Sequence, residues 1–541
     1  MTTGSVRGAT LADDYVMDAR RDRLVIAASS LGTVFEWYDF FIYGTLAPII
    51  GRTFFPTDNP NVELLYSLAG FAIGFGFRPL GAVLFGFLGD RLGRKYTFLA
   101  TIILMGVATA LVGLLPSAAT IGWVAPAVLI LLRILQGLAL GGEYGGAAIY
   151  VAEHAPVARR GFYTSFIQAG VIGGFILSLL VVVGTQWAVG QAVWDAWGWR
   201  LPFLFSLALL AISLWMRLKL KESPIFVAMK QAGGQAKNPL KESFTYPGNR
   251  KRIFVALFGV AAGLTVISYT LMFQSMYFLQ NSLRVDPVVT RLLVGGGISC
   301  GLFFFIYFGW LSDRVGRRKP VLLGYGATLL LLFPIFHLMG QAANPGIAQL
   351  ARTAPVLVSG PDCSFDPFAK VQATACGRLL DYLSKKGVHY SKSVSGETQV
   401  SVAGEAQSDT SPAVLDKVLA AKGYDFSPVK PPLGSMIVIF LCMVVLSALS
   451  GATYGSVAAM LSELFPARIR YSSMSIPYHI GTGYFGGFLP LVSQYIVART
   501  GDPYSGLWYT IVVVAFALLV ALWGLPETRG RSLAAGVDGN G

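Results

Sequence analysis

The stretch that decides the fold is GFLGDRLGRK at residues 86–95, which returns as GWLSDRVGRR at residues 309–318. Both copies read G-x-L-x-D-R-x-G-R-[KR], and both lie between two long apolar runs. The second copy begins 223 residues after the first, at 309 against 86. The chain therefore contains an internal duplication, and its architecture has to be interpreted as two related halves.

A second pair of segments supports the duplication. EHAPVARR at residues 153–160 matches ELFPARIR at residues 463–470, with an offset of 310 residues. The two offsets differ by 87 residues, so the second half has to carry that much additional chain between residues 318 and 463. A polar stretch at about residues 345–432 has no counterpart in the first half and supplies it.

Composition indicates a helical membrane protein. Of 541 residues 54% are hydrophobic and only 13% are charged, whereas a soluble domain carries about a quarter charged residues. The apolar runs are about 20 residues long and continuous rather than alternating, which disfavours a porin-like barrel. The net charge of +14 lies in short loops between these runs, so it does not indicate nucleic-acid binding. The sequence contains no P-loop for ATP and no cleavable signal.

Twelve apolar stretches are long enough to span a membrane. They are expected at about residues 24–48, 64–88, 96–116, 123–151, 164–187, 200–217, 253–280, 289–311, 320–340, 433–461, 472–498 and 506–525. The loops rich in lysine and arginine all fall on one side only if both termini are cytoplasmic. The polar insert at 345–432 is then extracytoplasmic.

This arrangement predicts three parts: an N-terminal six-helix bundle at residues 1–216, a basic cytoplasmic link at 217–252, and a C-terminal six-helix bundle at 253–541 that the insert interrupts. The link holds nine lysines and arginines, and we expect short amphipathic helices in contact with lipid headgroups.

The insert is expected to hold two helices and a flexible segment. Residues 366–383 and 414–421 show helical spacing of apolar side chains, and residues 393–411 are rich in Ser, Gly, Thr and Gln. Cys363 and Cys376 are candidates for a disulfide on the oxidising side of the membrane. A metal site is disfavoured because only His389 is near them. We favour a stabilising cap over substrate capture as the role of the insert.

Charged residues inside spans are costly and usually functional. Glu36 and Asp39 share one face of the first span, and Arg78 and Arg133 lie at similar depth in the second and fourth. Mutual pairing that only stiffens the bundle is one interpretation. In the other, Asp39, or Glu36 as second choice, carries a proton by alternating between it and an arginine. Arg78 or Arg133 would then bind an anionic group of the substrate.

The second half has few charges but several hydrogen-bonding side chains within its spans, among them Tyr454 and His479. A charged half that faces a hydrogen-bonding half suits a polar solute bound between the two repeats. The candidate residues for substrate binding and for the charge network are Arg78, Arg133, Gln136, Glu143, Tyr43, Gln168, Tyr269, Gln274 and Tyr478.

The repeated turns predict a charge latch that favours one facing state of the protein. Asp90 or Asp313 can cap the helix that follows it and accept hydrogen bonds from a nearby arginine, while the glycines permit a tight turn. The candidate gating residues are Gly86, Asp90, Arg91, Gly93 and Arg94 in the first copy and Gly309, Asp313, Arg314, Gly316 and Arg317 in the second.

These motifs resemble those of the major facilitator superfamily, through the paired turns and the R-x-x-Q-G at residues 133–137. The chain is similar, more narrowly, to the metabolite:proton symporters, which include permeases for α-ketoglutarate, citrate, shikimate and proline/betaine. The segments that carry this likeness are 32–40, 77–81, 133–145 and 153–161. The resemblance implies an all-α membrane protein with the major facilitator fold, twelve transmembrane helices in two six-helix bundles, alternating access and proton-driven uptake in a bacterial inner membrane.

Residues and resemblance together predict a proton-coupled symporter for a small polar metabolite, with an organic carboxylate favoured. The alternatives are a proline- or betaine-type zwitterion, a uniporter or exporter, and a sensor that does not transport. We expect no enzyme activity, no cofactor beyond the proton gradient and no metal. The expected partners are the solute, protons and lipid, not nucleic acid, and the chain is expected to be a monomer.

Overall fold

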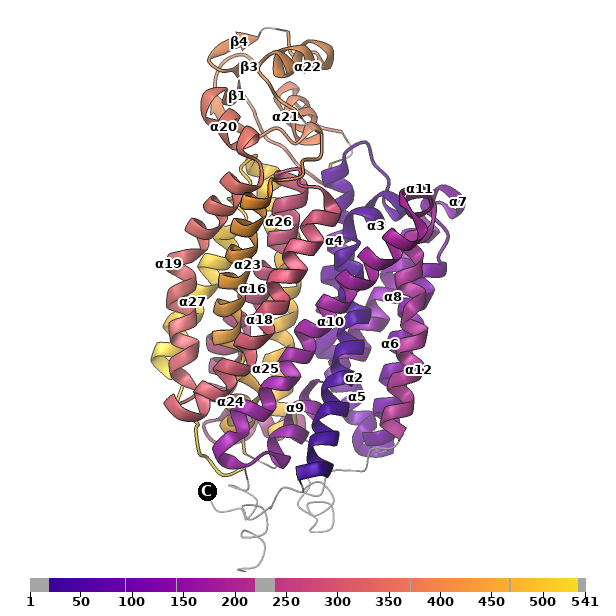
Figure 1. Ribbon diagram of the computed structural model, residues 1–541, viewed down its shortest axis with the longest axis vertical. Helices are drawn as coiled ribbons and strands as arrows, with labels where there is room; N and C mark the ends of the chain where they lie inside the picture. Colours follow the sequence, from indigo (N-terminus) through magenta and orange to yellow (C-terminus); the bar gives the residue numbers. More distant parts are fainter. Residues whose placement is uncertain are drawn as a thin grey trace, which may run out of the picture.

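The structure is a computed structural model that describes residues 19–92, 94–142, 144–218, 239–369, 371–407, 409–425, 427–466 and 469–533. It is a tall bundle of helices with a small αβ unit at one end (Figure 1). We call that end the insert end and the other the latch end. α2 begins at the latch end, opposite the small unit (Figure 1).

The first half of the bundle runs from α2 to α12. Its helices are α2 (Ala19–Thr45), α3 (Ala47–Phe54), α4 (Pro60–Gly76), α5 (Arg78–Leu92), α6 (Arg94–Leu114), α7 (Ala118–Ile121), α8 (Val124–Gly141), α9 (Tyr144–His154), α10 (Arg160–Val189), α11 (Gln191–Ala196) and α12 (Leu201–Leu218). Glycines bring α8 against α4 and α5: a Cβ at Gly137 would overlap the Gly74 carbonyl, and one at Gly141 the Arg78 carbonyl. Such contacts let helix backbones approach closely where apolar lipid supplies no hydrophobic drive.

The second half runs from α14 to α27. Its elements are α14 (Pro239–Thr245), α15 (Asn249–Phe254), η3 (Val255–Ala261), α16 (Ala262–Tyr269), η4 (Thr270–Gln274), α17 (Ser275–Tyr277), η5 (Phe278–Ser282), α18 (Pro287–Val315), α19 (Arg318–Ala343), α23 (Leu433–Tyr454), α24 (Val457–Leu464), α25 (Arg470–Ile480), η7 (Gly481–Gly487), α26 (Leu489–Thr500) and α27 (Leu507–Gly524). The segments η3, η4, η5 and η7 are π-helical, and such wider turns often occur at functional sites.

Each of the twelve stretches expected to span the membrane coincides with helix in the structure. Among the described residues, nine helical stretches are both long and apolar enough to cross a bilayer. The helical membrane fold is therefore confirmed, and the count of twelve spans stays a prediction. Residues 219–238 of the predicted link lie outside the described residues.

The two halves pack together along α10 and α18, which lie side by side through the middle of the bundle (Figure 1). At their latch end the contact is tight, because a Cβ on Gly309 would lie 2.5 Å from Cβ of Ser165. The repeated motif therefore places a glycine where one half touches the other.

Residues 345–432, which we call the insert, form a compact unit with its own hydrophobic core. Its elements are α20 (Pro345–Thr353), β1 (Val356–Gly360), α21 (Ala375–Lys386), β2 (Tyr390–Val394), β3 (Gln399–Val402), β4 (Glu405–Gln407) and α22 (Pro412–Ala421). The sheet order is β2-β1-β3-β4; α21 connects the parallel pair β1 and β2, and the other pairs are antiparallel. Val358, Leu380, Val400 and Leu419 are among the residues buried between the sheet and the two helices.

The prediction of a helix over residues 366–383 is wrong at its start, because α21 begins at Ala375. Thr374 caps it, with its hydroxyl accepting from the backbone N–H of Gly377 at 2.9 Å. Before the cap, Gln372 folds back on Asp366 through hydrogen bonds of 2.8 and 3.2 Å, and this loop replaces the first helical turns. The helix expected at 414–421 is confirmed as α22.

The prediction of a flexible segment at 393–411 is also wrong, since β3 and β4 form a hairpin there. Ala403 and Gly404 have positive φ values of 54° and 82° and make its two-residue turn. Val400 and Val402 face the insert core. The composition of the segment did not indicate this hairpin, because only alternate residues of so short a strand have to be apolar.

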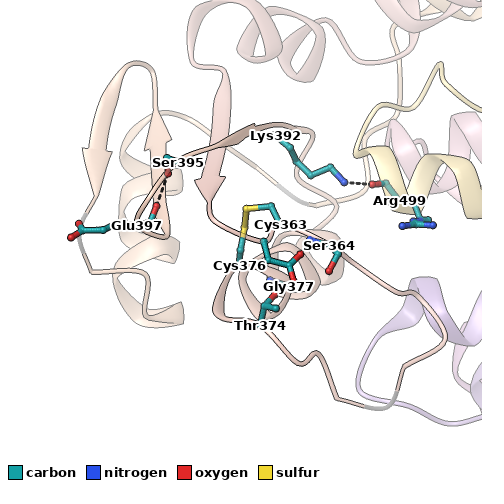
Figure 2. The surroundings of a disulfide bond; sticks show 10 residues. Cys363, Ser364, Thr374, Cys376, Gly377, Lys392, Ser395, Glu397 and Arg499 are labelled. Atoms are coloured by element: carbon teal, nitrogen blue, oxygen red, sulfur yellow. Dashed lines mark hydrogen bonds between the residues drawn. A yellow bond between two sulfur atoms is a disulfide. The ribbon is translucent and has the colours of Figure 1, made fainter.

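Cys363 and Cys376 form a disulfide in the insert, with their Cα atoms 4.9 Å apart (Figure 2). The bond ties the loop after β1 to the first turn of α21 and closes a step of 13 residues. A unit this small buries little apolar surface, so a cross-link contributes a large share of its stability.

We predict that replacing Cys363 and Cys376 by serine destabilises the insert by about 2–3 kcal/mol, because the loop between them regains its freedom in the unfolded state. Hydrogen exchange followed by mass spectrometry should show faster exchange in β1 and α21 and unchanged exchange in α10 and α18. Cys300→Ser, at a free and exposed cysteine, is the control. Unchanged exchange in the insert would contradict a stabilising role of the disulfide.

Candidate functional site

A small closed cavity lies between the two halves at the centre of the bundle. Its lining residues are Trp37 on α2, Gln168, Val171 and Ile172 on α10, Ser268, Tyr269 and Met272 on α16 and η4, Phe305 on α18, Tyr454 on α23 and Thr482 on η7. Its volume of about 10 Å³ is close to the minimum that one water molecule needs. The structure therefore holds the centre of the bundle in a closed form that would have to widen to admit a metabolite.

Arg78 is fully buried beside this cavity. Its guanidinium carbon lies 5.0 Å from the ring centroids of both Trp37 and Phe75, so the cation rests on aromatic faces. It also interacts electrostatically with Tyr269 and His479 of the second half. The break between α4 and α5 at Phe77 puts Arg78 at a helix start, from which it reaches the interface.

Two second-half side chains near Arg78 retain unused hydrogen-bonding groups. Among the described residues, the hydroxyl of Tyr269 and both ring nitrogens of His479 are buried without a hydrogen-bond partner. A neutral imidazole offers one donor and one acceptor, and a phenol offers a donor. Together with the Arg78 guanidinium they can bind an anionic or hydroxylated solute between the halves.

Arg133 lies in a second charged region, inside the first half. Its guanidinium carbon is 4.2 Å from the ring centroid of Tyr43, and its nitrogens are buried without a hydrogen-bond partner among the described residues. Asp39 interacts with it electrostatically, and Asp39 and Glu36 are both 5% exposed. Of the four charges predicted at one depth, Arg78 lies against Trp37 of the cavity wall, whereas Arg133 interacts with Asp39 and neither of these two lines the cavity.

Other predicted residues support these two regions. Gln136 donates to the hydroxyl of Thr109 at 2.6 Å beside Asp39, and the Tyr43 hydroxyl donates to the Ser67 carbonyl at 3.0 Å. The hydroxyls of Tyr478 and Tyr454 are 3.1 Å apart at the cavity wall. Gln274 is instead bonded to Gln494 at 3.0 Å, toward the insert end. Glu143 lies outside the described residues.

Sequence reasoning missed Trp37, Ser268 and Thr482 as cavity residues. Trp37 stands between Glu36 and Tyr38 in the span that was singled out for its acids, and no polar group marked it as a wall residue. Ser268 and Thr482 are single small hydroxyl side chains, which are common in apolar helices. Only the packing of α16 and η7 against α2 and α10 brings the three together.

Four aromatic side chains, Phe41, Phe71, Phe175 and Phe273, close the cavity toward the insert end, and we call them the aromatic layer. The Phe273 ring lies 5.2–5.9 Å from the rings of Phe41, Phe71 and Phe175, and it packs against Gly44. One turn further on, the Tyr277 hydroxyl donates to the Gly44 carbonyl at 2.7 Å. These contacts join α2 and α4 to η4 and α17, so they have to part if this end opens.

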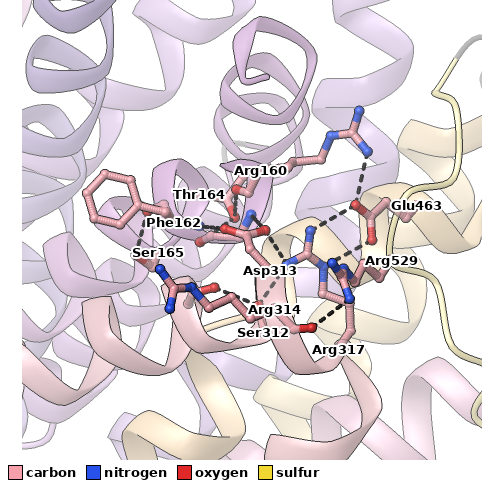
Figure 3. Close-up of polar contacts among 12 residues, drawn as sticks. Arg160, Phe162, Thr164, Ser165, Ser312, Asp313, Arg314, Arg317, Glu463 and Arg529 are labelled. Carbon is pink, nitrogen blue, oxygen red and sulfur yellow. Dashed lines mark hydrogen bonds and ion pairs between the residues drawn. The ribbon is translucent and has the colours of Figure 1, made fainter. Parts of the chain in front are cut away.

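The latch end is closed by a buried ion network that we call the latch: Arg160, Asp313, Arg317 and Glu463 (Figure 3). Asp313 accepts from the backbone N–H groups of Gly161 and Phe162, both at 2.8 Å, at the start of α10 in the other half. A carboxylate at a helix N-terminus satisfies free N–H groups and is favoured by the helix dipole. The expectation that Asp313 caps the helix that follows it is therefore wrong.

Arginines complete the latch. Arg317 bonds to Asp313 at 2.6 Å and to Glu463 at 3.2 Å, and Arg160 bonds to Glu463 at 2.9 Å across the two halves (Figure 3). Arg314 is not part of this network and lies over the Trp310 ring at 3.9 Å. The side chains of the first motif copy, from Gly86 to Arg94, lie outside the described residues.

Two further hydrogen bonds join the halves. The Tyr484 hydroxyl donates to the Gly76 carbonyl at 3.1 Å, and the Tyr471 hydroxyl donates to the Gly142 carbonyl at 3.2 Å. Both bonds cross the interface between the halves, so they have to break if the halves separate here.

Glu527 caps the helix that Asp313 was expected to cap. Its carboxylate accepts from the backbone N–H groups of Arg317 at 2.8 Å and Arg318 at 3.3 Å, at the start of α19. Burial tends to raise the pKa of Glu527, but these donors, with those of Thr528 and Arg529, outweigh it and hold the pKa below its usual 4.5. The charged carboxylate thus ties the segment after α27 to the latch.

We predict that Asp313→Asn costs about 1.5–3 kcal/mol of stability, because a neutral amide loses its charge-assisted hydrogen bonds to α10 and Arg317. Thermal unfolding in detergent measures this loss. Arg314→Gln is the matched control, since it changes an adjacent charge outside the latch. Equal melting temperatures for Asp313→Asn and the native protein would contradict the role of the latch.

We predict that Glu527 adds stability that is present above pH 4.5 and is lost as the pH falls through its lower folded-state pKa, because the folded state then has to bind a proton. Melting temperatures of the native protein should fall over this acid range, and those of Glu527→Gln should fall less. Parallel pH profiles for the two proteins would show that Glu527 makes no such contribution.

Comparison with known proteins agrees with this architecture. The chain is 31% identical to the inner membrane metabolite transport protein YhjE of Escherichia coli over 94% of its own length and 95% of that protein. It is 40% identical to the Escherichia coli shikimate transporter over 61% of its length and 75% of that protein. It is 30% identical to the glycine betaine/proline/ectoine/pipecolic acid transporter OusA of Dickeya dadantii, over 98% and 88%.

Among solved structures, the fold is similar to that of a major facilitator superfamily proton:xylose symporter, with a TM-score of 0.63 at 15% identity over 97% of this chain and 99% of the other. A family model described as sugar (and other) transporter matches residues 24–253 and 418–535, the two halves without most of the insert. The predicted resemblance is confirmed, as is the interpretation as a transporter and not an enzyme. The chain belongs to the sugar (and other) transporter family of the major facilitator superfamily.

Proposed function

We propose that the protein is a proton-coupled symporter that takes up a small organic carboxylate by alternating access, with Arg78 as the group that binds the carboxylate. The observation that carries this proposal is the position of Arg78 beside a closed cavity, facing unused hydrogen-bonding groups of Tyr269 and His479. Guanidinium binds carboxylate in two parallel hydrogen bonds. The similarity to a shikimate transporter supports a solute that carries both a carboxylate and hydroxyls.

We assign proton coupling to Asp39 and Arg133. Both are buried, they interact electrostatically, and neither lines the cavity. A buried carboxylate can exchange an arginine partner for a proton, and each state is favoured by a different arrangement of the helices around it. No cofactor is needed beyond the proton gradient, and the chain functions as a monomer in this proposal.

The orientation of the protein follows from the loop charges. The latch end and both termini face the cytoplasm, and the insert faces the extracytoplasmic side of a bacterial inner membrane. The similarity to an inner membrane protein supports this placement. Because the cavity is enclosed on both sides, the structure corresponds to an intermediate from which either the latch or the aromatic layer parts.

A zwitterion such as a betaine is the second candidate solute. Trp37, Tyr269 and Tyr454 line the cavity, and aromatic faces attract quaternary ammonium groups. The similarity to a betaine transporter over nearly the whole chain supports it. In that case Arg78 would bind the carboxylate of the zwitterion and the aromatic rings its ammonium.

We predict that proteoliposomes with an inward proton gradient accumulate shikimate or a related carboxylate. Asp39→Asn should abolish this accumulation, because its side chain cannot carry the proton, but should leave exchange of the solute across the membrane intact. Arg78→Gln should raise KM about 10- to 100-fold through loss of charge-assisted hydrogen bonds.

Arg200→Gln, at a half-buried arginine bonded to the Leu115 carbonyl at 3.2 Å within the first half, is the control for Arg78. Accumulation that does not depend on the proton gradient would contradict symport. Accumulation of betaine with none of the carboxylates would replace the favoured solute with the zwitterion.

A further inference from the structure

The insert contacts both halves of the bundle, but its connections to the second half are more extensive. The chain enters it directly from α19 and leaves it into α23, both in the second half. Arg284 donates to the Lys386 carbonyl at 2.7 Å, Lys392 donates to the Arg499 carbonyl at 2.6 Å (Figure 2), and Val285 forms a parallel bridge with Val429. The insert is therefore fixed to the second half by backbone and side-chain bonds.

Among the described residues, the insert's hydrogen bonds to the first half come from α4 and the residue before it. Asn59 donates to Asp381 at 2.7 Å, and Asn61 donates to the carbonyl and hydroxyl oxygens of Ser384 at 2.6 and 3.1 Å. Tyr66 adds a bond of 3.2 Å to the Phe368 carbonyl. Asp381 and Ser384 stand one turn apart on α21, so one face of this helix accepts the bonds from Asn59 and Asn61, and the loop at Phe368 accepts the third.

A second cavity of about 60 Å³ lies beneath this contact. Its wall combines Asn61, Leu64 and Leu65 of α4, Ser384, Gly387, Val388, His389 and Tyr390 of the insert, and Asn281, Ser282, Gln494, Val497, Ala498 and Gly501 of the second half. It has room for several water molecules and offers amide, hydroxyl and imidazole groups without a formal charge. Burial lowers the pKa of His389 against the opposing influence of Asp502, so its imidazole is neutral near pH 7.

The second cavity leads toward the central one. The Asn281 amide nitrogen is buried without a hydrogen-bond partner in the part of the chain that the structure describes. Gln494, on the wall, bonds to Gln274, which directly follows Phe273 of the aromatic layer. A polar solute that passes this point reaches the aromatic layer above the central cavity.

We propose that this second cavity is the entry chamber of the transport path and that the insert is its lid. The chamber takes a small polar solute with hydroxyl or carboxylate acceptors, and the lid moves with the second half and releases α4 when the outer side opens. This rests on the proposed alternating access: bonds between halves have to break as the halves move, whereas bonds within the second half persist.

The first test uses two thiol probes that need no knowledge of the solute. Ser282→Cys reports on the chamber and Ser268→Cys on the central cavity, each in a background with Cys300 and Cys442 replaced by serine. A membrane-impermeant maleimide is added from the extracytoplasmic side. Asn61→Cys with Ser384→Cys, oxidised with copper phenanthroline and checked by mass spectrometry, locks the lid to α4.

Locking is expected to reduce labelling of both probes at least about tenfold, while the single-probe proteins treated with the same oxidant keep their labelling. Labelling of Ser282→Cys that survives the lock would show that the lid does not cover the chamber. Loss at Ser282→Cys with unchanged labelling at Ser268→Cys would show another route to the central cavity. Either result overturns the proposal.

The second test opens the lid instead, and it stands even if the disulfide does not form. Asn61→Ala with Asp381→Ala removes three hydrogen bonds between the halves and should raise the labelling rate at Ser268→Cys at least about tenfold, by favouring the open state. Lys422→Ala, which breaks an ion pair of 2.7 Å inside the insert, is the control. Equal labelling rates in the two variants would contradict the proposal that the insert is a lid.

These outcomes do not depend on which solute is transported. If labelling depends on the state of the lid but no carboxylate accumulates in proteoliposomes, the proposed solute is wrong and the lid proposal stands. If the locked protein still takes up the carboxylate, the lid proposal is wrong and the proposed solute stands.

Discussion

The carboxylate of Asp313 at the start of α10 is the interaction on which the arrangement of the two halves depends. It brings a negative charge from α18 to the positive end of a helix in the other half, in a setting that excludes most water. Arg317 and Glu463 compensate that charge, and Arg160 extends the compensation back across the interface. Because each buried charge would be costly if left alone, the network is favourable only when complete, and a small separation of the halves removes it as a unit.

An ion network that breaks as a unit suits a protein that alternates between an arrangement closed at one end and an arrangement closed at the other. The latch and the aromatic layer close opposite ends of the same interface. The latch consists of charges that lose their partners on opening, whereas the aromatic layer consists of apolar rings that lose packing. Between them lies a cavity too small for a metabolite, with Arg78 resting on aromatic faces beside it. Neither Arg133 nor Asp39 lines the cavity, so the proposed symport would bind solute and proton at separate places and couple them through the movement of α2.

The insert shows how a small unit becomes ordered at the end of a membrane bundle. Its own core is modest, and three additional constraints support it: the disulfide, both chain connections to the second half, and hydrogen bonds with Arg284 and with the Arg499 carbonyl of that half. The bonds from α21 to α4 differ from these because they cross the interface between the halves. They lie over the second cavity, and this position is the basis of the proposal that the insert is a lid, a role that its composition does not indicate.

The sequence by itself determined the duplication, the helical membrane class, the places of the helices, the buried charges and the pair of cysteines. Each of these depends on local pattern: apolar run length, motif spacing, or the cost of burying a charge in a span. Only the tertiary structure decided which groups these side chains bond to. It directed Asp313 to α10 and left α19 to Glu527, and it placed Arg78 against Trp37 and Arg133 against Tyr43. It also began α21 at Ala375 and folded residues 399–407 into a hairpin. The physical reason is that a side chain's bonding capacity is local, whereas the group that satisfies it comes from chain up to several hundred residues away.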